Sequence, residues 1–106
     1  MSVADIFSNM PNSFNAEKAG DLNANVVFDL SGDGGGAWTV SVANGKATVA
    51  EGASPGATAT IRMAASDYED MTSGKLNPMM AFMSGKIKVE GDLNTVMKFQ
   101  TLFGMG

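Results

Sequence analysis

The sequence contains no cysteine and no histidine among its 106 residues. Without cysteine, the chain forms no disulfide and offers neither a thiolate nucleophile nor a thiolate ligand for a metal. Without histidine, it lacks the commonest general base, the Ser-His and Cys-His nucleophile pairs, and the usual ligands of catalytic zinc. These absences nearly exclude conventional hydrolases, because the groups left for chemistry are carboxylates, a few lysines and one tyrosine. We predict no metal site and no cofactor.

Positive charge is also scarce, with seven basic residues against eleven acidic ones and a net charge of −4. This balance weighs against a nucleic-acid partner, because such binding relies on lysine and arginine to neutralise phosphates. It also removes any attraction of the whole molecule to an anionic membrane. We therefore expect no nucleic-acid partner and no more than transient membrane contact.

Long apolar runs are missing as well. None approaches the roughly 20 residues that a transmembrane helix needs. The N-terminal stretch "MSVADIFSNM" lacks the positive start and apolar block of a secretory signal, and the C-terminal "LFGMG" matches no lipidation or organelle address. A chain of 106 residues has room for one core only. The expectation is a single cytoplasmic domain over residues 1–106.

The spacing of apolar residues changes from helical to alternating along the first two thirds of the chain. Helical spacing predicts a helix over residues 3–10, followed by a single turn capped by Asn15. Alternation then predicts strands with one covered face, and Asn44-Gly45 predicts a tight hairpin because both turn positions need a positive φ. The predicted strands are residues 25–30, 38–42, 47–49 and 58–63.

Helical spacing returns in the last third of the chain. Ser66 and Glu69 match a capping box, which predicts a helix from Ser66 to Gly74. The other predicted elements are a helix from Asn77-Pro78 to Gly85, a strand over residues 86–90, and a helix capped by Asp92 that runs to about Phe103.

Three polar segments have both a functional and a simpler interpretation. The "GDGGG" at residues 32–36 resembles a phosphate loop, but it lies between two predicted strands and lacks a Gly-Lys-Ser/Thr sequence, so we favour a hairpin loop. Asp67, Glu69 and Asp70 offer carboxylates for catalysis, but a helix N-terminus also attracts acidic residues, and we favour this structural role. Four lysines either form a solvated face or hold a carboxylate or phosphate head group. These are Lys75, Lys86, Lys88 and Lys98.

Methionine is abundant, with nine residues in the chain. Its side chain fills irregular gaps in a core and equally suits surfaces that accept variable shapes. Five methionines lie on the helices predicted after the strands, so an ordinary core and an apolar ligand cavity both remain open. These are Met71, Met79, Met80, Met83 and Met97. The last helix also places Gln100 amid apolar residues, where an amide without a partner would cost about 1–3 kcal/mol.

Three segments carry a resemblance to a known family. Residues 74–100, "GKLNPMMAFMSGKIKVEGDLNTVMKFQ", contain Gly-Lys-x-Asn-Pro, Ala-Phe, Gly-Lys-x-Lys and Met-Lys-x-Gln elements in a fixed order. "WTVSVANGKATV" at residues 38–49 and "ATIRMAASDYEDMTSGK" at residues 59–75 precede them. Together these segments are similar to the sterol carrier protein domain: to its second hairpin, to its fourth strand with the helix after it, and to its C-terminal half. The resemblance covers about residues 14–103.

The resemblance implies an α/β fold. Its expected form is a five-stranded mixed, largely antiparallel sheet with helices covering one face and an apolar tunnel between the layers. By this resemblance, a short helix of the tunnel would carry Met80, Phe82 and Met83. The helix that closes the tunnel would carry Met97, Phe99 and Gln100. The predicted ligand-binding residues are Trp38, Val40, Tyr68, Met71, Met80, Phe82, Met83, Ile87, Val96, Met97, Phe99, Gln100 and Phe103.

The family binds sterols, fatty acids, fatty acyl-CoA and other lipids and is not enzymatic. The resemblance therefore implies non-catalytic binding of a lipid or fatty acyl ligand, for carriage or presentation. The methionine content favours a flexible chain over a rigid sterol, and the lack of a targeting tail leaves peroxisomal residence unsupported.

Three alternatives to this function stay open. One is an accessory module that presents substrate to a separate lipid-metabolising enzyme or makes that enzyme oligomerise, and another is a homodimer. A third is an enzyme that uses the acidic helix and the lysines on an acyl substrate, which would require a turnover that Asp67→Ala abolishes.

Overall fold

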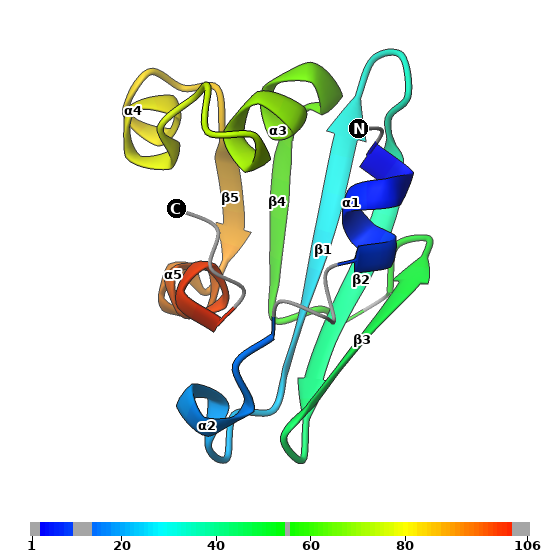
Figure 1. Ribbon diagram of the computed structural model, residues 1–106, viewed down its shortest axis with the longest axis vertical. Coiled ribbons are helices and arrows are strands. Elements are labelled where there is room, and N and C mark those ends of the chain that lie inside the picture. Colours follow the sequence, from blue (N-terminus) through cyan, green and yellow to red (C-terminus); the bar gives the residue numbers. More distant parts are fainter. Residues whose placement is uncertain (1–2, 10–13, 55, 103–106) are drawn as a thin grey trace.

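The computed structural model describes residues 3–9, 14–54 and 56–102, and for Pro78, Gln100 and Thr101 it describes the backbone only. The strands form one sheet in the order β3-β2-β1-β4-β5 (Figure 1). The central strands β1 and β4 run parallel, and the other neighbouring pairs are antiparallel. The strands are β1 (Ala24–Ser31), β2 (Gly36–Ala43), β3 (Lys46–Glu51), β4 (Ala59–Ala64) and β5 (Lys88–Gly91). The predicted mixed, largely antiparallel sheet is confirmed.

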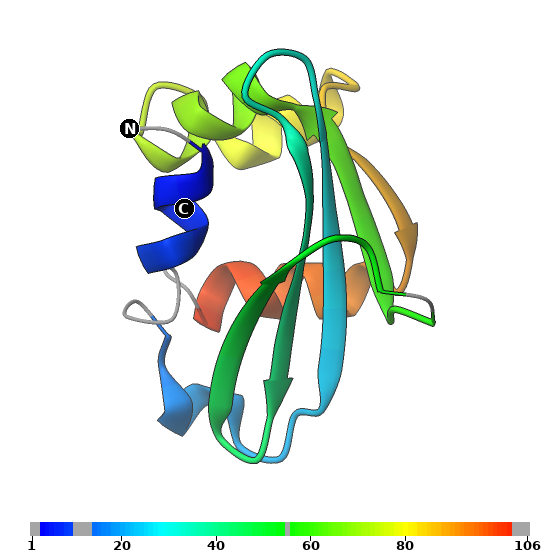
Figure 2. The same cartoon turned by 90° about the vertical axis from the view of Figure 1, so that its right-hand side faces the viewer.

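The helices cover one face of this sheet, as the view along its edge shows (Figure 2). They are α1 (Val3–Asn9), α2 (Ala16–Ala19), α3 (Ala65–Thr72), α4 (Pro78–Met83) and α5 (Leu93–Leu102). Two of them, α4 and α5, lie at opposite ends of the edge strand β5 (Figure 1). The covered sheet face carries the alternating apolar residues that the sequence pattern predicts, such as Val26, Phe28 and Leu30 on β1, all of which are buried.

Four of the local signals for turns and caps are confirmed. Asn44 and Gly45 have φ values of 54° and 73°, as a tight hairpin between β2 and β3 requires. The side chain of Asn15 accepts a hydrogen bond from the Lys18 backbone N–H, and that of Asn77 accepts from the N–H groups of Met79 and Met80. The Asp92 carboxylate accepts from the Asn94 N–H and the Thr95 hydroxyl. These caps satisfy N–H groups that a helix leaves without an internal partner.

The predicted capping box at Ser66 is wrong. The helix α3 already begins at Ala65, and its N-cap, Ala64, makes no side-chain hydrogen bond. The physical reason is that β4 leads into α3 without a loop: Ala64 still pairs with β1, and Ala65 and Tyr68 are then buried against the core. Tertiary burial therefore determines where this helix starts, in place of the cap.

The last strand is displaced from its predicted position. It covers Lys88–Gly91 where residues 86–90 were expected, because the Lys86 N–H donates to the Ala81 carbonyl and closes the end of α4. The first helix ends at Asn9 within the described residues, and its predicted last residue, Met10, lies outside them.

Four aromatic rings join the helices to the centre of the sheet. The ring of Phe7 on α1 stacks on Trp38 of β2 with centroids 4.8 Å apart, and on Tyr68 of α3 at 5.2 Å. Phe28 of β1 meets the edges of both Phe7 and Tyr68, at 5.3 and 5.7 Å. Stacked and edge-on pairs at these distances are favourable beyond the area they bury. This cluster fixes α1 and α3 on the sheet.

Candidate functional site

Six of the predicted ligand-binding side chains are buried between the sheet and its helices. They are Trp38, Val40, Tyr68, Ile87, Val96 and Phe99. Burial raises the pKa of the Tyr68 hydroxyl well above its usual value, because a phenolate would lose its hydration there. The phenol therefore stays protonated at physiological pH, which makes the single tyrosine of the chain a poor general base.

Four other members of the predicted set are exposed. Met80, Phe82 and Met83 on α4 and Met97 on α5 have between 42% and 79% of their surface in contact with solvent. Met79 and Leu93, which are not in the predicted set, are also exposed. We call Met79, Met80, Phe82 and Met83 the α4 apolar surface, whereas Leu93 and Met97 lie on α5, at the other end of β5. A cluster of large apolar side chains on one helix is typical of a binding surface, whereas isolated exposed ones are common anywhere.

The orientation of α4 explains this exposure. Its six residues, "PMMAFM", include one small side chain, Ala81, and Ala81 is the residue that turns inward and is fully buried. A helix that packs through alanine approaches its neighbours closely, and its larger side chains are then left on the outside. The helical pattern of the sequence identifies α4 as apolar, but it does not identify which side of α4 faces the core.

Three members of the predicted set remain to be placed. Met71 on α3 is half-buried and packs against the core. Phe103 lies outside the described residues, and only the backbone of Gln100 is described, within α5. Their contact with a ligand stays a prediction.

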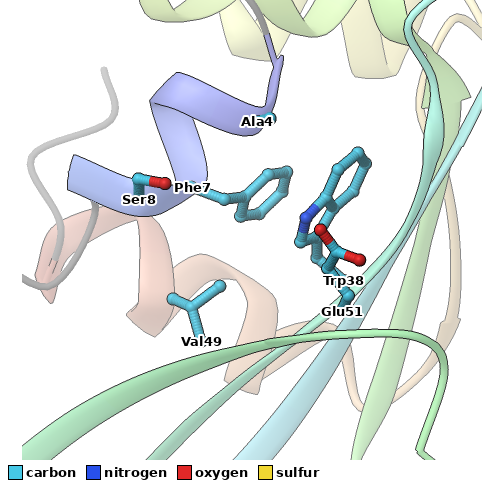
Figure 3. A pocket seen from close by; sticks show the side chains of 6 residues that line it. All are labelled: Ala4, Phe7, Ser8, Trp38, Val49 and Glu51. Carbon is cyan, nitrogen blue, oxygen red and sulfur yellow. The ribbon is translucent and has the colours of Figure 1, made fainter.

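A pocket of about 230 Å³ lies between α1 and the strands β2 and β3 (Figure 3). Phe7 and Trp38 form its aromatic wall, Val49 lies below them, and Glu51 stands beside the indole. Ala4 and Ser8 complete the lining. Trp38 is the one predicted ligand-binding residue among these. Helical spacing assigns Phe7 to a core-facing side, but no local signal places it on Trp38, 31 residues away in the sequence.

The glycine-rich segment forms the predicted hairpin loop. Residues 32–35 connect β1 to β2, and the Gly35 N–H donates to the Gly32 carbonyl. Asp67 lies in the first turn of α3. In the part of the chain that the structure describes, no group of three or more acidic side chains is arranged to hold a metal ion. The described helices also include none that is both long and apolar enough to cross a bilayer.

Comparison with known proteins agrees with the fold and with the sequence elements. The model of the SCP-2 sterol transfer family matches residues 6–104. Human sterol carrier protein 2 is 40% identical over 86 residues, which are 81% of this chain and 16% of that protein. Hydroxysteroid dehydrogenase-like protein 2 of Xenopus laevis is 34% identical over 103 residues, 96% of this chain and 25% of that protein.

A solved structure shares the fold. The solution structure of palmitated SCP2L2 from Aedes aegypti has a TM-score of 0.81 and 19% sequence identity, with 97% of this chain and 95% of that chain covered. The chain spans about a sixth of human sterol carrier protein 2 and a quarter of the dehydrogenase-like protein. The family model covers nearly the whole sequence, and the fold agrees with it. The chain therefore belongs to the SCP-2 sterol transfer family.

Proposed function

We propose that this domain binds the flexible chain of a fatty acid, a fatty acyl thioester or a related lipid, and that it catalyses no reaction on it. The observation that carries the proposal is the α4 apolar surface, where Met80, Phe82 and Met83 of the predicted ligand-binding set are exposed. Family membership and the palmitated relative support a lipid ligand.

The energy of apolar burial is sufficient for such binding. Each buried methylene contributes about 0.8 kcal/mol, so a chain of about ten carbons offers roughly 8 kcal/mol before the costs of ordering. Without those costs this free energy would correspond to roughly micromolar affinity, so a chain of this length binds more weakly and a longer acyl chain is needed to reach that value. Methionine side chains are unbranched and adjust to the bends of an acyl chain. We therefore expect flexible chains to bind better than a rigid sterol.

The chemistry of the described groups supports a non-catalytic role. The sequence has no histidine or cysteine, and the tyrosine is buried with a raised pKa. A second candidate is an accessory module that presents a lipid to a separate enzyme. The dehydrogenase-like relative favours it, because a domain like this one makes up a quarter of that protein. In both cases the isolated chain binds the lipid.

Trp38 offers a direct test of lipid binding. Its indole lines the pocket and is stacked on Phe7, so a chain that enters next to it changes the polarity around the ring. We expect palmitate to change the tryptophan emission saturably, while butyrate at equal concentration leaves it unchanged. Affinity should fall less than about twofold between low and physiological salt, because screening acts weakly on apolar contacts.

Two results together would reject the lipid-binding proposal. One is tryptophan emission and calorimetry that stay flat with palmitate, palmitoyl-CoA and cholesterol. The other is native mass spectrometry of the purified protein that finds no co-purified lipid. A strong salt dependence would instead assign the affinity to a head-group site made of lysines.

Gln100 is proposed as the polar anchor for the ligand head group, because the sequence places it amid the apolar residues of α5, where an amide needs a partner. Gln100→Leu keeps a similar volume and removes the amide. If the amide contacts the ligand, the variant should bind a fatty acid more weakly by about 1–2 kcal/mol, the value of one hydrogen bond, and bind a hydrocarbon of equal length unchanged. Thermal melts with and without ligand separate this role from a structural one. A variant that loses several degrees of stability and keeps its affinity would assign Gln100 to the backbone.

A further inference from the structure

Charge is distributed unevenly along this acidic chain. Residues 71–89 contain three lysines and no acidic residue, although the whole chain has a net charge of −4. Lys75 lies in the connection before α4 and Lys86 directly after it, and both are exposed. The third, Lys88, pairs in the sheet with Arg62, whose side chain points away from the buried face. The helix α4 is therefore bracketed by two exposed positive charges.

The outer side of this helix is apolar. Met79, Met80, Phe82 and Met83 have 61%, 68%, 42% and 79% of their surface exposed. They occupy four of the six positions of α4, so this is a continuous patch on one turn and a half of helix. Figure 1 places α4 at the periphery of the molecule, next to α3 and at one end of the edge strand β5. Nothing among the described helices covers the patch from outside.

The acidic residues that follow this region are engaged elsewhere. Glu90 forms a salt bridge with Arg62, and the Asp92 carboxylate caps α5 through the Asn94 N–H and the Thr95 hydroxyl. The acidic residues of α3, Asp67, Glu69 and Asp70, are partly buried and precede Lys75. The Lys75 N–H donates to the Asp70 carbonyl, so Lys75 lies next to the end of this acidic helix. Lys86 is therefore the lysine with the largest expected electrostatic effect.

Apolar side chains between flanking lysines are complementary to an anionic bilayer. The methionines, being flexible, adapt to the disordered boundary between head groups and acyl chains. A lysine stem lies along apolar surface while its ammonium reaches head-group phosphates, and each lysine near an anionic leaflet adds to the attraction. The net negative charge of the chain acts against this attraction as a whole, so the docking is local and reversible.

We propose that α4, with Lys75 and Lys86, docks on the surface of an anionic lipid bilayer. Met79 and Met83 enter the interface, and the two lysines contact phosphate groups. This deepens the proposed function and rests on it, since the docked helix carries part of the predicted lipid-binding set and brings that site to the membrane that supplies or receives the lipid.

The test is co-sedimentation of the lipid-free chain with vesicles of phosphatidylcholine, with and without phosphatidylserine. Stronger binding to the vesicles with phosphatidylserine is expected. Lys86→Glu should weaken that binding by at least about fivefold, and Met79→Glu by about tenfold or more. Lys46→Glu is the charge-matched control, because Lys46 is exposed on β3 at the opposite edge of the sheet. It should bind within about twofold of the parent.

A second readout separates docking from lipid binding. Lys86 is outside both the predicted ligand-binding set and the exposed apolar side of α4, so Lys86→Glu should retain the palmitate response of Trp38 and the melting temperature of the parent. Vesicle binding that survives both substitutions overturns the docking proposal. A second result also overturns it: the parent does not bind vesicles but forms a dimer in size-exclusion chromatography, and Met79→Glu dissociates this dimer. In that case α4 contacts a second copy of the chain. Docking without any palmitate response supports the docking proposal and counts against the lipid-binding function, so the two proposals fail separately.

Discussion

Replacing Phe7 with alanine is expected to lower the free energy of unfolding by about 3–5 kcal/mol. Phe7 is 1% exposed and its ring contacts those of Phe28, Trp38 and Tyr68, with centroids 4.8–5.3 Å away. Truncation removes these contacts and leaves a cavity beside the existing pocket. Because small domains are stable by only about 5–15 kcal/mol in total, this loss is a large part of the stability.

Denaturant unfolding measures this effect. The emission of Trp38 should also shift to longer wavelength in the folded variant, because water reaches the indole face that Phe7 covers. The matched control is Ser8→Ala, an exposed neighbour on the same helix that should change stability by less than about 0.5 kcal/mol. A Phe7→Ala variant that loses less than about 1 kcal/mol would show that the stacked rings do not hold α1 on the sheet.

The double substitution Met80→Ser with Met83→Ser is expected to weaken palmitate binding by about tenfold or more, with little change in stability. Both side chains are largely exposed, at 68% and 79%, so the core does not depend on them. If the ligand covers both methionines in the parent, it loses these two apolar contacts in the serine variant. Burial of each such side chain is worth about 1.5–3 kcal/mol when complete. Even partial cover therefore accounts for a tenfold loss, which is about 1.4 kcal/mol.

The control for this pair is Met80→Leu with Met83→Leu, which keeps the apolar area and should bind palmitate within about threefold of the parent. Titration by calorimetry, with palmitate below its micelle concentration, separates ligand binding from contact with vesicles. Should the serine pair bind palmitate like the parent, the acyl chain lies elsewhere, and the pocket lined by Phe7, Trp38 and Val49 becomes the leading site.

Features that depend on neighbouring residues were predictable from the sequence. The Asn44-Gly45 turn and the caps at Asn15, Asn77 and Asp92 involve hydrogen bonds or dihedral angles within three or four positions. Such groups act on the adjacent backbone whatever the rest of the chain does. The alternation of the strands likewise identified the sheet face that is buried. The five-stranded mixed sheet came from the family resemblance and was confirmed, whereas the strand order β3-β2-β1-β4-β5 was seen only in the structure.

Features that depend on distant segments were decided by tertiary structure alone. The start of α3 at Ala65 follows from the parallel pairing of β4 with β1, and that pairing replaces the local cap at Ser66. The stacking of Phe7 on Trp38 joins two elements 31 residues apart. No short-range pattern carries either piece of information.

The candidate site shows the same division. The spacing of apolar residues identified residues 79–83 as an apolar helix. The composition, which lacks histidine and cysteine, argued against conventional hydrolase chemistry. Whether an apolar side chain is covered depends on which other segment reaches it. Only the packed structure showed that Ala81 faces the core while Met79, Met80 and Met83 remain exposed. The hydrophobic effect acts on the area removed from water, and that area is a property of the assembled layers.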